Sequence, residues 1–166
     1  ITMAGAHQMW RQDLHTGEIE RFAGAGSPGL QDGTRSSAML CQPSGITHDG
    51  VRLFFTDAGS SSIRWVYLPP ASQLSTWVGQ GVFEYGDRDG PGRRALLQNP
   101  LGLVHHVGSL YIADTYNNKI KRLNPRLARV DTLLGIGEVG CNDGDQPTFN
   151  QPHDLAVADE RLWVAD

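Results

Sequence analysis

Two kinds of side chain in this sequence could hold a metal ion: closely spaced aspartates, and a histidine beside an aspartate. Asp87 and Asp89 lie two residues apart in GDRDGPG (86–92), a spacing found in calcium loops, and NDGD (142–145) is similar. Neither stretch continues with the further oxygen ligands and the late glutamate that an EF-hand loop requires. We therefore predict turns at both stretches and no cofactor, with Ca²⁺ as the alternative.

His153 and Asp154 are the other candidate metal ligands. The sequence contains no serine-centred nucleophile elbow, no phosphate-binding loop and no HExxH motif. We therefore predict no catalytic residue. Whether the chain is an enzyme stays open, with a non-enzymatic role favoured.

The composition limits the possible partners. The chain has 166 residues, 20 of them glycine, and a formal net charge of −4, which argues against general binding to nucleic acid. No apolar run approaches the roughly 20 residues of a membrane span, so no membrane association is expected. Cys41 and Cys141 lack a zinc-binding pattern and are predicted to be unpaired thiols. The location stays open, with the cytoplasm favoured.

Four signals recur in the same order: a glycine-rich strand end, an Asp-Gly turn, a proline-led segment and an apolar strand that ends in aspartate. The turns are Asp32-Gly33, Asp89-Gly90 and Asp143-Gly144, and the strand-ending aspartates are Asp57, Asp114 and Asp166. These signals divide a single region, 1–166, into units of about 1–26, 27–81, 82–137 and a partial 138–166.

Each unit is predicted to contain four short strands. In the second unit these are GITHD, RLFFTDA, IRWVYL and LSTWVG, bounded by turn residues. The second strand is apolar on both alternating faces, which indicates a sheet that is covered on both sides. Because each blade of a propeller packs between two neighbours, the sequence predicts an all-β propeller with four-stranded blades.

The stretch DGPGRRALLQNPLGLVHHVGSLYIADTYNNKIKRL (89–123) resembles the NHL repeat, which joins an Asp-Gly turn, an Ala-x-Leu step, a Pro-x-Gly strand and a YVAD-like hairpin. Residues 32–64 and 143–166 repeat this pattern. The chain is thus similar to the NHL-repeat β-propellers, in particular to NHL repeat-containing protein 2 and its bacterial relatives. In those proteins a thioredoxin-like domain precedes the propeller, so the resemblance implies that any redox role lies outside these residues.

Two positions depart from the repeat. Met3 stands where the other units have the strand-ending aspartate, and Asp154 stands where they have Gly45 and Gly102. Asp57, Asp114 and Asp166 themselves are interpreted as structural, each accepting hydrogen bonds from backbone N–H groups of the following turn. The histidines at equivalent positions, His48 and His105, are expected to pack or to face solvent.

The sequence holds three blades' worth of strands, which is half of a six-bladed ring, whereas propellers have typically four to eight blades. Two arrangements would close the ring. The chain is either a piece of a longer protein or one half of a homodimer whose copies meet head to tail and complete each other's end blades.

The resemblance implies a non-catalytic scaffold that binds a protein or a small ligand. The expected binding surface consists of the loops after Gly26, Gly81 and Gly137 with their Asp-Gly turns, together with the basic residues Lys119, Lys121 and Arg122. One alternative is a metal-dependent lyase or hydrolase that uses the propeller axis, near His153 and Asp154. The other is RNA binding through a basic face around 117–129, which added salt would weaken.

Overall fold

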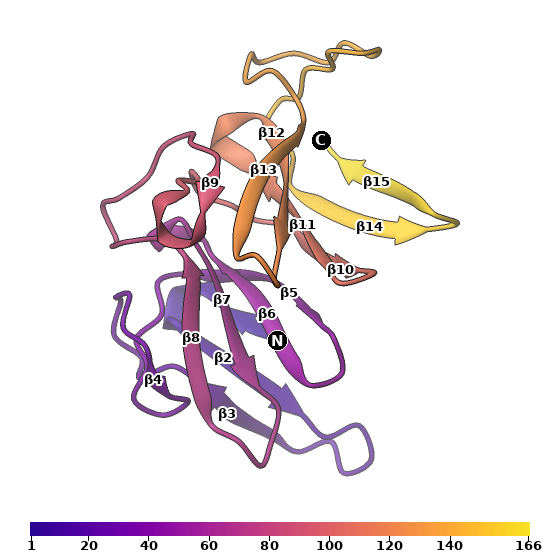
Figure 1. Ribbon diagram of the computed structural model, residues 1–166. Coiled ribbons are helices and arrows are strands. Elements are labelled where there is room, and N and C mark those ends of the chain that lie inside the picture. The colour runs from indigo at the N-terminus through magenta and orange to yellow at the C-terminus, as the bar shows by residue number, and fades with distance from the viewer.

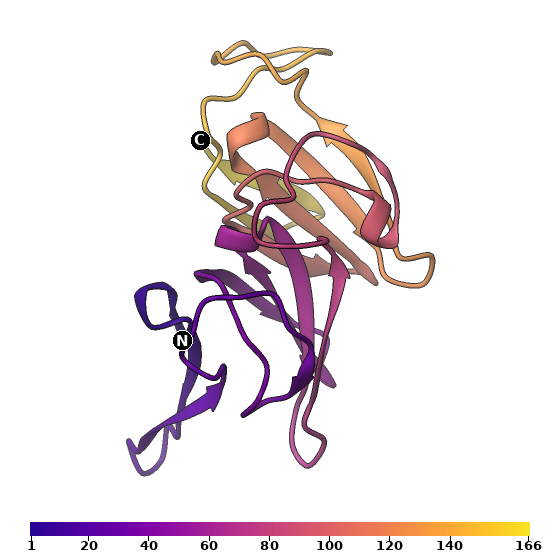
Figure 2. The same ribbon diagram turned by 90° about the vertical axis from the view of Figure 1, so that its left-hand side faces the viewer.

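The chain folds into four antiparallel sheets that follow one another in sequence order. The computed structural model describes residues 1–166, and its regular elements are fifteen strands and four short 3₁₀ helices. In both views the sheets succeed one another from the indigo N-terminal end to the orange and yellow C-terminal end (Figure 1 and Figure 2). No helix has the length and apolar character needed to cross a membrane. The predicted all-β class is confirmed.

Sheets 2 and 3 are complete and share one strand order. Sheet 2 runs in the order β5 (Pro43–His48), β6 (Arg52–Asp57), β7 (Ser62–Tyr67), β8 (Gln73–Val78) and β4 (Gly33–Thr34). Sheet 3 runs in the order β10 (Leu103–His106), β11 (Ser109–Asp114), β12 (Lys119–Asn124), β13 (Arg129–Leu134) and β9 (Gly90–Pro91). Each therefore has a fifth, two-residue strand beyond the predicted four, because the chain after the Asp-Gly turn pairs with the fourth long strand.

Sheets 1 and 4 contain fewer strands. Sheet 1 consists of β1 (Thr2–Met3), β2 (Gln8–Gln12) and β3 (Ile19–Ala23), and sheet 4 consists of β14 (Asp154–Ala158) and β15 (Arg161–Ala165). By the repeat, sheet 1 holds the second, third and fourth strands of a unit, and sheet 4 holds the first and second.

A tight 3₁₀ turn connects the second and third strands of three sheets. These turns are η1 (Ala4–Ala6), η2 (Ala58–Ser60) and η4 (Thr115–Asn117), while η3 (Gly92–Arg94) follows β9. Each of the three ends on a residue in the left-handed conformation, namely His7, Ser61 and Asn118. Short polar side chains tolerate this conformation better than branched apolar ones.

The hydrophobic core consists of three layers, one between each pair of neighbouring sheets. Phe55 of β6 packs toward sheet 1, against Met9 and Phe22, while its neighbour Phe54 packs toward sheet 3, against Leu103. Both phenylalanines are fully buried. The prediction that the second strand buries both faces is therefore confirmed. A third layer, which includes Leu155, joins sheets 3 and 4.

The inner strands β5, β10 and β14 approach one another backbone to backbone. The Gly45 N–H donates to the Leu101 carbonyl at 2.9 Å, across the boundary between sheets 2 and 3. At Gly102, a β-carbon would lie 2.6 Å from Asp154 Cα and 2.7 Å from the His153 carbonyl oxygen, so no larger residue fits. Asp154 occupies the equivalent position in sheet 4, where no further sheet of this chain packs against it.

A second set of bonds joins the sheets at the hairpin end. The side chains of the left-handed residues accept hydrogen bonds from backbone N–H groups that precede a proline in the next sheet. The pairs are His7 with Gln42 at 3.2 Å, Ser61 with Asn99 at 3.1 Å and Asn118 with Gln151 at 3.0 Å. One residue position per unit thus fixes how neighbouring sheets are aligned.

We expect the Gly102→Ala substitution to lower the free energy of unfolding by roughly 1–3 kcal/mol, because the added methyl group overpacks a backbone contact. Gly5→Ala is the matched control, since a β-carbon at Gly5 has nothing within 4 Å. Urea unfolding followed by tryptophan fluorescence measures both. Equal stability of the two variants would contradict the close-packing account.

Candidate functional site

The strand-ending aspartates are structural, but their partners differ from those expected. Asp57 accepts the backbone N–H of Cys41, Asp114 that of Gln98 and Asp166 that of Asn150, each at 2.7 Å and each 16 residues earlier in the chain. The prediction placed these N–H donors in the following turn. They belong instead to the segment that leads into the proline and the inner strand. The carboxylate therefore ties the end of the second strand to the segment that precedes the first strand of the same sheet.

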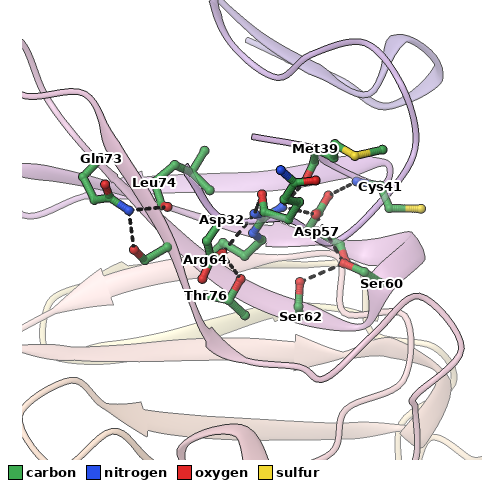
Figure 3. A network of polar contacts seen from close by, with 12 residues as sticks. Asp32, Met39, Cys41, Asp57, Ser60, Ser62, Arg64, Gln73, Leu74 and Thr76 are labelled. Atoms are coloured by element: carbon green, nitrogen blue, oxygen red, sulfur yellow. Dashed lines mark hydrogen bonds and ion pairs between the residues drawn. The ribbon is translucent and has the colours of Figure 1, made fainter. Parts of the chain in front are cut away.

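In sheet 2 the same carboxylate also holds a buried arginine. Arg64 of β7 is fully buried; its Nη1 donates to Asp57 Oδ2 at 3.0 Å and its Nη2 to Asp32 Oδ1 at 3.2 Å (Figure 3). Thr76 Oγ1 donates to Asp32 Oδ1 at 2.7 Å. Arg64 also donates to two backbone carbonyls, those of Met39 and Gln31. We call this arrangement, a third-strand cation between two aspartates, the cation clamp.

Sheet 3 contains the clamp again with lysine in place of arginine. Lys121 of β12 is fully buried; its Nζ lies 2.8 Å from Asp89 Oδ1, 2.6 Å from Asp87 Oδ1 and 3.9 Å from Asp114 Oδ2. Thr132 Oγ1 donates to Asp89 in the same way as Thr76 does to Asp32. Asp87 is an additional carboxylate in this sheet, and it also pairs with Lys119.

Burial and charge compete at each clamp carboxylate. Burial alone would raise the pKa of Asp87 and Asp89, but the hydrogen bonds from their lysine partners hold both below the usual range. Burial likewise opposes the charge of Lys121, yet its bonds to Asp87 and Asp89 raise its pKa. For Asp114, burial dominates and raises the pKa to about 7, against the bonds from Asn117 and Gln98. The more distant Lys121 compensates this carboxylate only in part.

Sheet 1 lacks both members of the clamp. Met3 replaces the strand-ending aspartate, and Trp10 stands seven residues later, where Arg64 and Lys121 stand relative to Asp57 and Asp114. A buried cation without its carboxylate is strongly unfavourable, so the two replacements belong together. The absence of the aspartate at Met3 is thus explained by the absence of the cation at Trp10.

The clamp changes the interpretation of the predicted basic surface. Lys121 is buried and Lys119 nearly so, with 16% of its side chain exposed, because both are paired with aspartates. Arg122 alone of the three faces solvent. Their strand, β12, lies inside the sheet between β11 and β13 rather than at its outer edge. The expectation of a surface formed by all three side chains is therefore wrong.

The metal candidates do not form a ligand cluster. Asp87 and Asp89 face lysine ammonium groups, and the structure contains no group of three or more His, Cys, Asp or Glu side chains suited to a metal. His153 and Asp154 do line a hollow between the inner strands, together with backbone around Gly45 and Gly102. There His153 Nδ1 contacts the Gln151 carbonyl at 2.9 Å, and Asp154 accepts from the Leu155 N–H.

The remaining candidates have varied surroundings. His105 packs against the Phe54 ring, His48 is exposed, and His106 lies 3.6 Å from Glu160. Cys41 and Cys141 are both free thiols, as predicted. Of the Asp-Gly turns, Asp32-Gly33 and Asp89-Gly90 lead into β4 and β9, while Asp143-Gly144 lies in an exposed loop.

Sequence reasoning missed the buried cations. Arg64 and Lys121 stand 57 residues apart, the same interval as Asp57 and Asp114. A basic residue that recurs at one position of the third strand is the signal that could have identified them, because a buried cation requires a recurring carboxylate partner.

We expect Lys121→Met to lower the free energy of unfolding by roughly 1–3 kcal/mol, because it leaves the buried Asp114 and the partly exposed Asp87 and Asp89 without their countercharge. Lys121→Arg should cost less, since Arg64 already fills the equivalent position in sheet 2. Arg11→Met is the control; it removes an exposed pair with Glu20 and should change stability by about 1 kcal/mol or less. Chemical unfolding at neutral pH compares the three. The clamp account fails if Lys121→Met and Arg11→Met are equally mild.

Asp114 should make stability fall as the pH rises. Its pKa is about 7 in the folded state against an ordinary value of 3.8, so the folded state binds the proton more tightly and loses that advantage between about pH 4 and pH 7. Urea unfolding of Asp114→Asn and of the unaltered chain from pH 5 to 8 should show the variant gaining relative stability with pH. Asp159→Asn, at an exposed position, is the control. A relative gain by the unaltered chain would be the opposite of this expectation.

Curated relatives match the chain over its full length. It is 38% identical over 178 residues to protein SUPPRESSOR OF QUENCHING 1, chloroplastic, of Arabidopsis thaliana, and 34% identical over 193 residues to NHL repeat-containing protein 2 of Gallus gallus and of Homo sapiens. The chain spans 17% of the length of the first relative and 26% and 27% of the other two. No protein-family model matches the chain.

Solved structures share the fold at lower identity. A protein of unknown function from Bacteroides thetaiotaomicron superimposes with a TM-score of 0.77 at 23% identity, over 98% of this chain and 40% of that one. An auxiliary nutrient binding protein from the same organism gives 0.75 at 22% identity, over 98% and 41%. A chain of the nidogen–laminin complex gives 0.56 at 19% identity, over 99% and 66%.

These structural neighbours are propeller-like, and at this level of identity they establish the fold alone. The sequence relatives carry the name of the repeat that the chain itself displays. Over its whole length this chain is therefore similar to a part of NHL repeat-containing protein 2, and its antiparallel sheets share the fold of propeller-like structures.

Proposed function

We propose that this chain is a non-catalytic binding scaffold whose rigid sheets present the connections between units to a protein or small ligand. The observation that carries this proposal is the recurrence of the cation clamp. It engages the acidic and basic side chains that the sequence offered for chemistry in ion pairs within the chain: the partly exposed Asp32 pairs with Arg64, and the partly exposed Asp87 and Asp89 pair with the buried Lys121. The connections after the fourth strand differ in length and composition from unit to unit, so they supply the variable part.

The relatives support a binding role in general terms. One structural neighbour is named as an auxiliary nutrient binding protein and another is a chain of a nidogen/laminin complex, and both share this fold. The chain covers only a part of its curated relatives, so the role concerns these residues alone.

We further propose that sheets 2 and 3 are propeller blades of four strands with a short fifth strand added, that sheets 1 and 4 are parts of further blades, and that the chain supplies three blades' worth of strands, half of a six-bladed ring. The open inner edge of sheet 1 and the open face of sheet 4 support this arrangement. Either further blades of a longer chain or a second copy would complete the ring. Light scattering distinguishes these cases, since a second copy doubles the 18.1 kDa mass and a monomer excludes the homodimer.

The binding role is tested by thermal unfolding of the isolated chain in the presence of four probes: a peptide library, a set of oligosaccharides, Ca²⁺ or Zn²⁺, and a single-stranded RNA at low and moderate salt. We expect stabilisation by a peptide or small ligand, since binding to the folded state raises stability by mass action. Stoichiometric metal with turnover of a substrate would favour the lyase or hydrolase alternative. Salt-sensitive RNA binding would favour the RNA alternative.

A further inference from the structure

The connection between sheets 2 and 3 is longer than the fold requires. Each unit has an equivalent connection, which begins at a glycine after the fourth strand and ends at a second glycine. The N–H of that second glycine donates to a backbone carbonyl, that of Leu40, Leu97 or Phe149 in turn. The three connections are Gly26–Gly29, Gly81–Gly86 and Gly137–Gly140. The first and third use two intervening residues and the second uses four, Val82 to Tyr85. Two residues suffice for this crossing, so the extra pair in the second unit needs another explanation.

The inserted segment presents aromatic side chains to solvent. Phe83 is 87% exposed and Tyr85 60% exposed, and Tyr116 of the adjacent η4 is 54% exposed. Asn117 Nδ2 donates to the Gly86 carbonyl at 2.8 Å. This bond joins the residue that follows Tyr85 to the residue that follows Tyr116. A turn with the Glu84 N–H bonded to the Gly81 carbonyl at 3.2 Å shapes the start of the segment. The aromatic side chains thus gather on a segment that the protein holds in place.

The charged residue within the inserted segment is a carboxylate that no ion pair engages. Glu84 lies between Phe83 and Tyr85, is exposed and takes part in no ion pair. Nearby in the sequence, Arg88 directs its Nε to the Arg94 carbonyl, and Lys119 is paired with Asp87. Aromatic faces and a free carboxylate together attract a cationic side chain, through cation–π contact and ion pairing.

We propose that the segment Gly81–Gly86, together with Tyr116, is a docking site for a protein partner that presents an arginine or lysine side chain. The cation packs over Phe83 or Tyr85 and pairs with Glu84, while the exposed ring of Tyr116 extends the contact area. Aromatic residues and arginine are enriched at such interfaces, where a few of them supply most of the binding energy. This inference rests on the proposed scaffold function and assigns it a place and a partner chemistry.

The test is selection of a random peptide library displayed on phage against the full 166-residue chain, followed by calorimetric titration of the enriched peptides. We expect enriched peptides to contain arginine or lysine. Phe83→Ala and Glu84→Lys should each weaken their binding roughly tenfold or more, which corresponds to about 1.4 kcal/mol. The matched controls are Leu14→Ala, at a side chain 91% exposed on the β2–β3 turn, and Glu18→Lys, at an exposed carboxylate on the same turn.

Each result decides the proposal. Enrichment of peptides without basic residues, or equal binding by the loop variants and the controls, overturns the docking site and leaves the scaffold function standing. Absence of any enriched peptide also overturns the docking site, and the oligosaccharide arm of the thermal unfolding experiment then decides the scaffold function separately. Unchanged unfolding midpoints of Phe83→Ala and Glu84→Lys confirm that a loss of binding is local.

Discussion

A buried carboxylate at the end of the second strand, Asp57 or Asp114, is the interaction on which sheets 2 and 3 depend. It accepts a backbone N–H from the segment that enters the inner strand, and in sheets 2 and 3 it also faces a third-strand cation. One side chain therefore connects three parts of a unit that are separated in sequence. Because that entering segment delivers the inner strand to the contact between sheets, the stacking of the sheets depends on it as well.

The charge balance around this carboxylate has consequences for function. A cation inside a sheet is tolerated only with its full set of carboxylates, so Met3 and Trp10 of sheet 1 replace the aspartate and the cation together. The same balance pairs Asp87 and Asp89 with Lys121, so these side chains compensate one another within the fold. The units differ from one another in the length and composition of the connections that follow their fourth strands.

A recurring frame with variable connections is the arrangement expected of a binding scaffold. Sheets that pack through apolar layers on both faces, with glycine at the close contact of the inner strands, leave little room for change. The connection between the fourth strand and the next unit crosses the surface and tolerates two additional residues. The exposed aromatic side chains of this connection, Phe83 and Tyr85, do not contribute to the hydrophobic core.

The sequence by itself determined the repeat, the all-β class, the doubly buried second strand and the structural role of Asp57 and Asp114, because each follows from local pattern and spacing. Only the tertiary structure decided which N–H groups these aspartates accept and that Arg64 and Lys121 are buried between carboxylates. It also decided why Gly45 and Gly102 must be glycine while Asp154 need not be. The physical reason is that partners 16 to 32 residues apart meet only when the chain has folded into its sheets. Residue type alone does not reveal whether a charged side chain is exposed or paired inside a sheet.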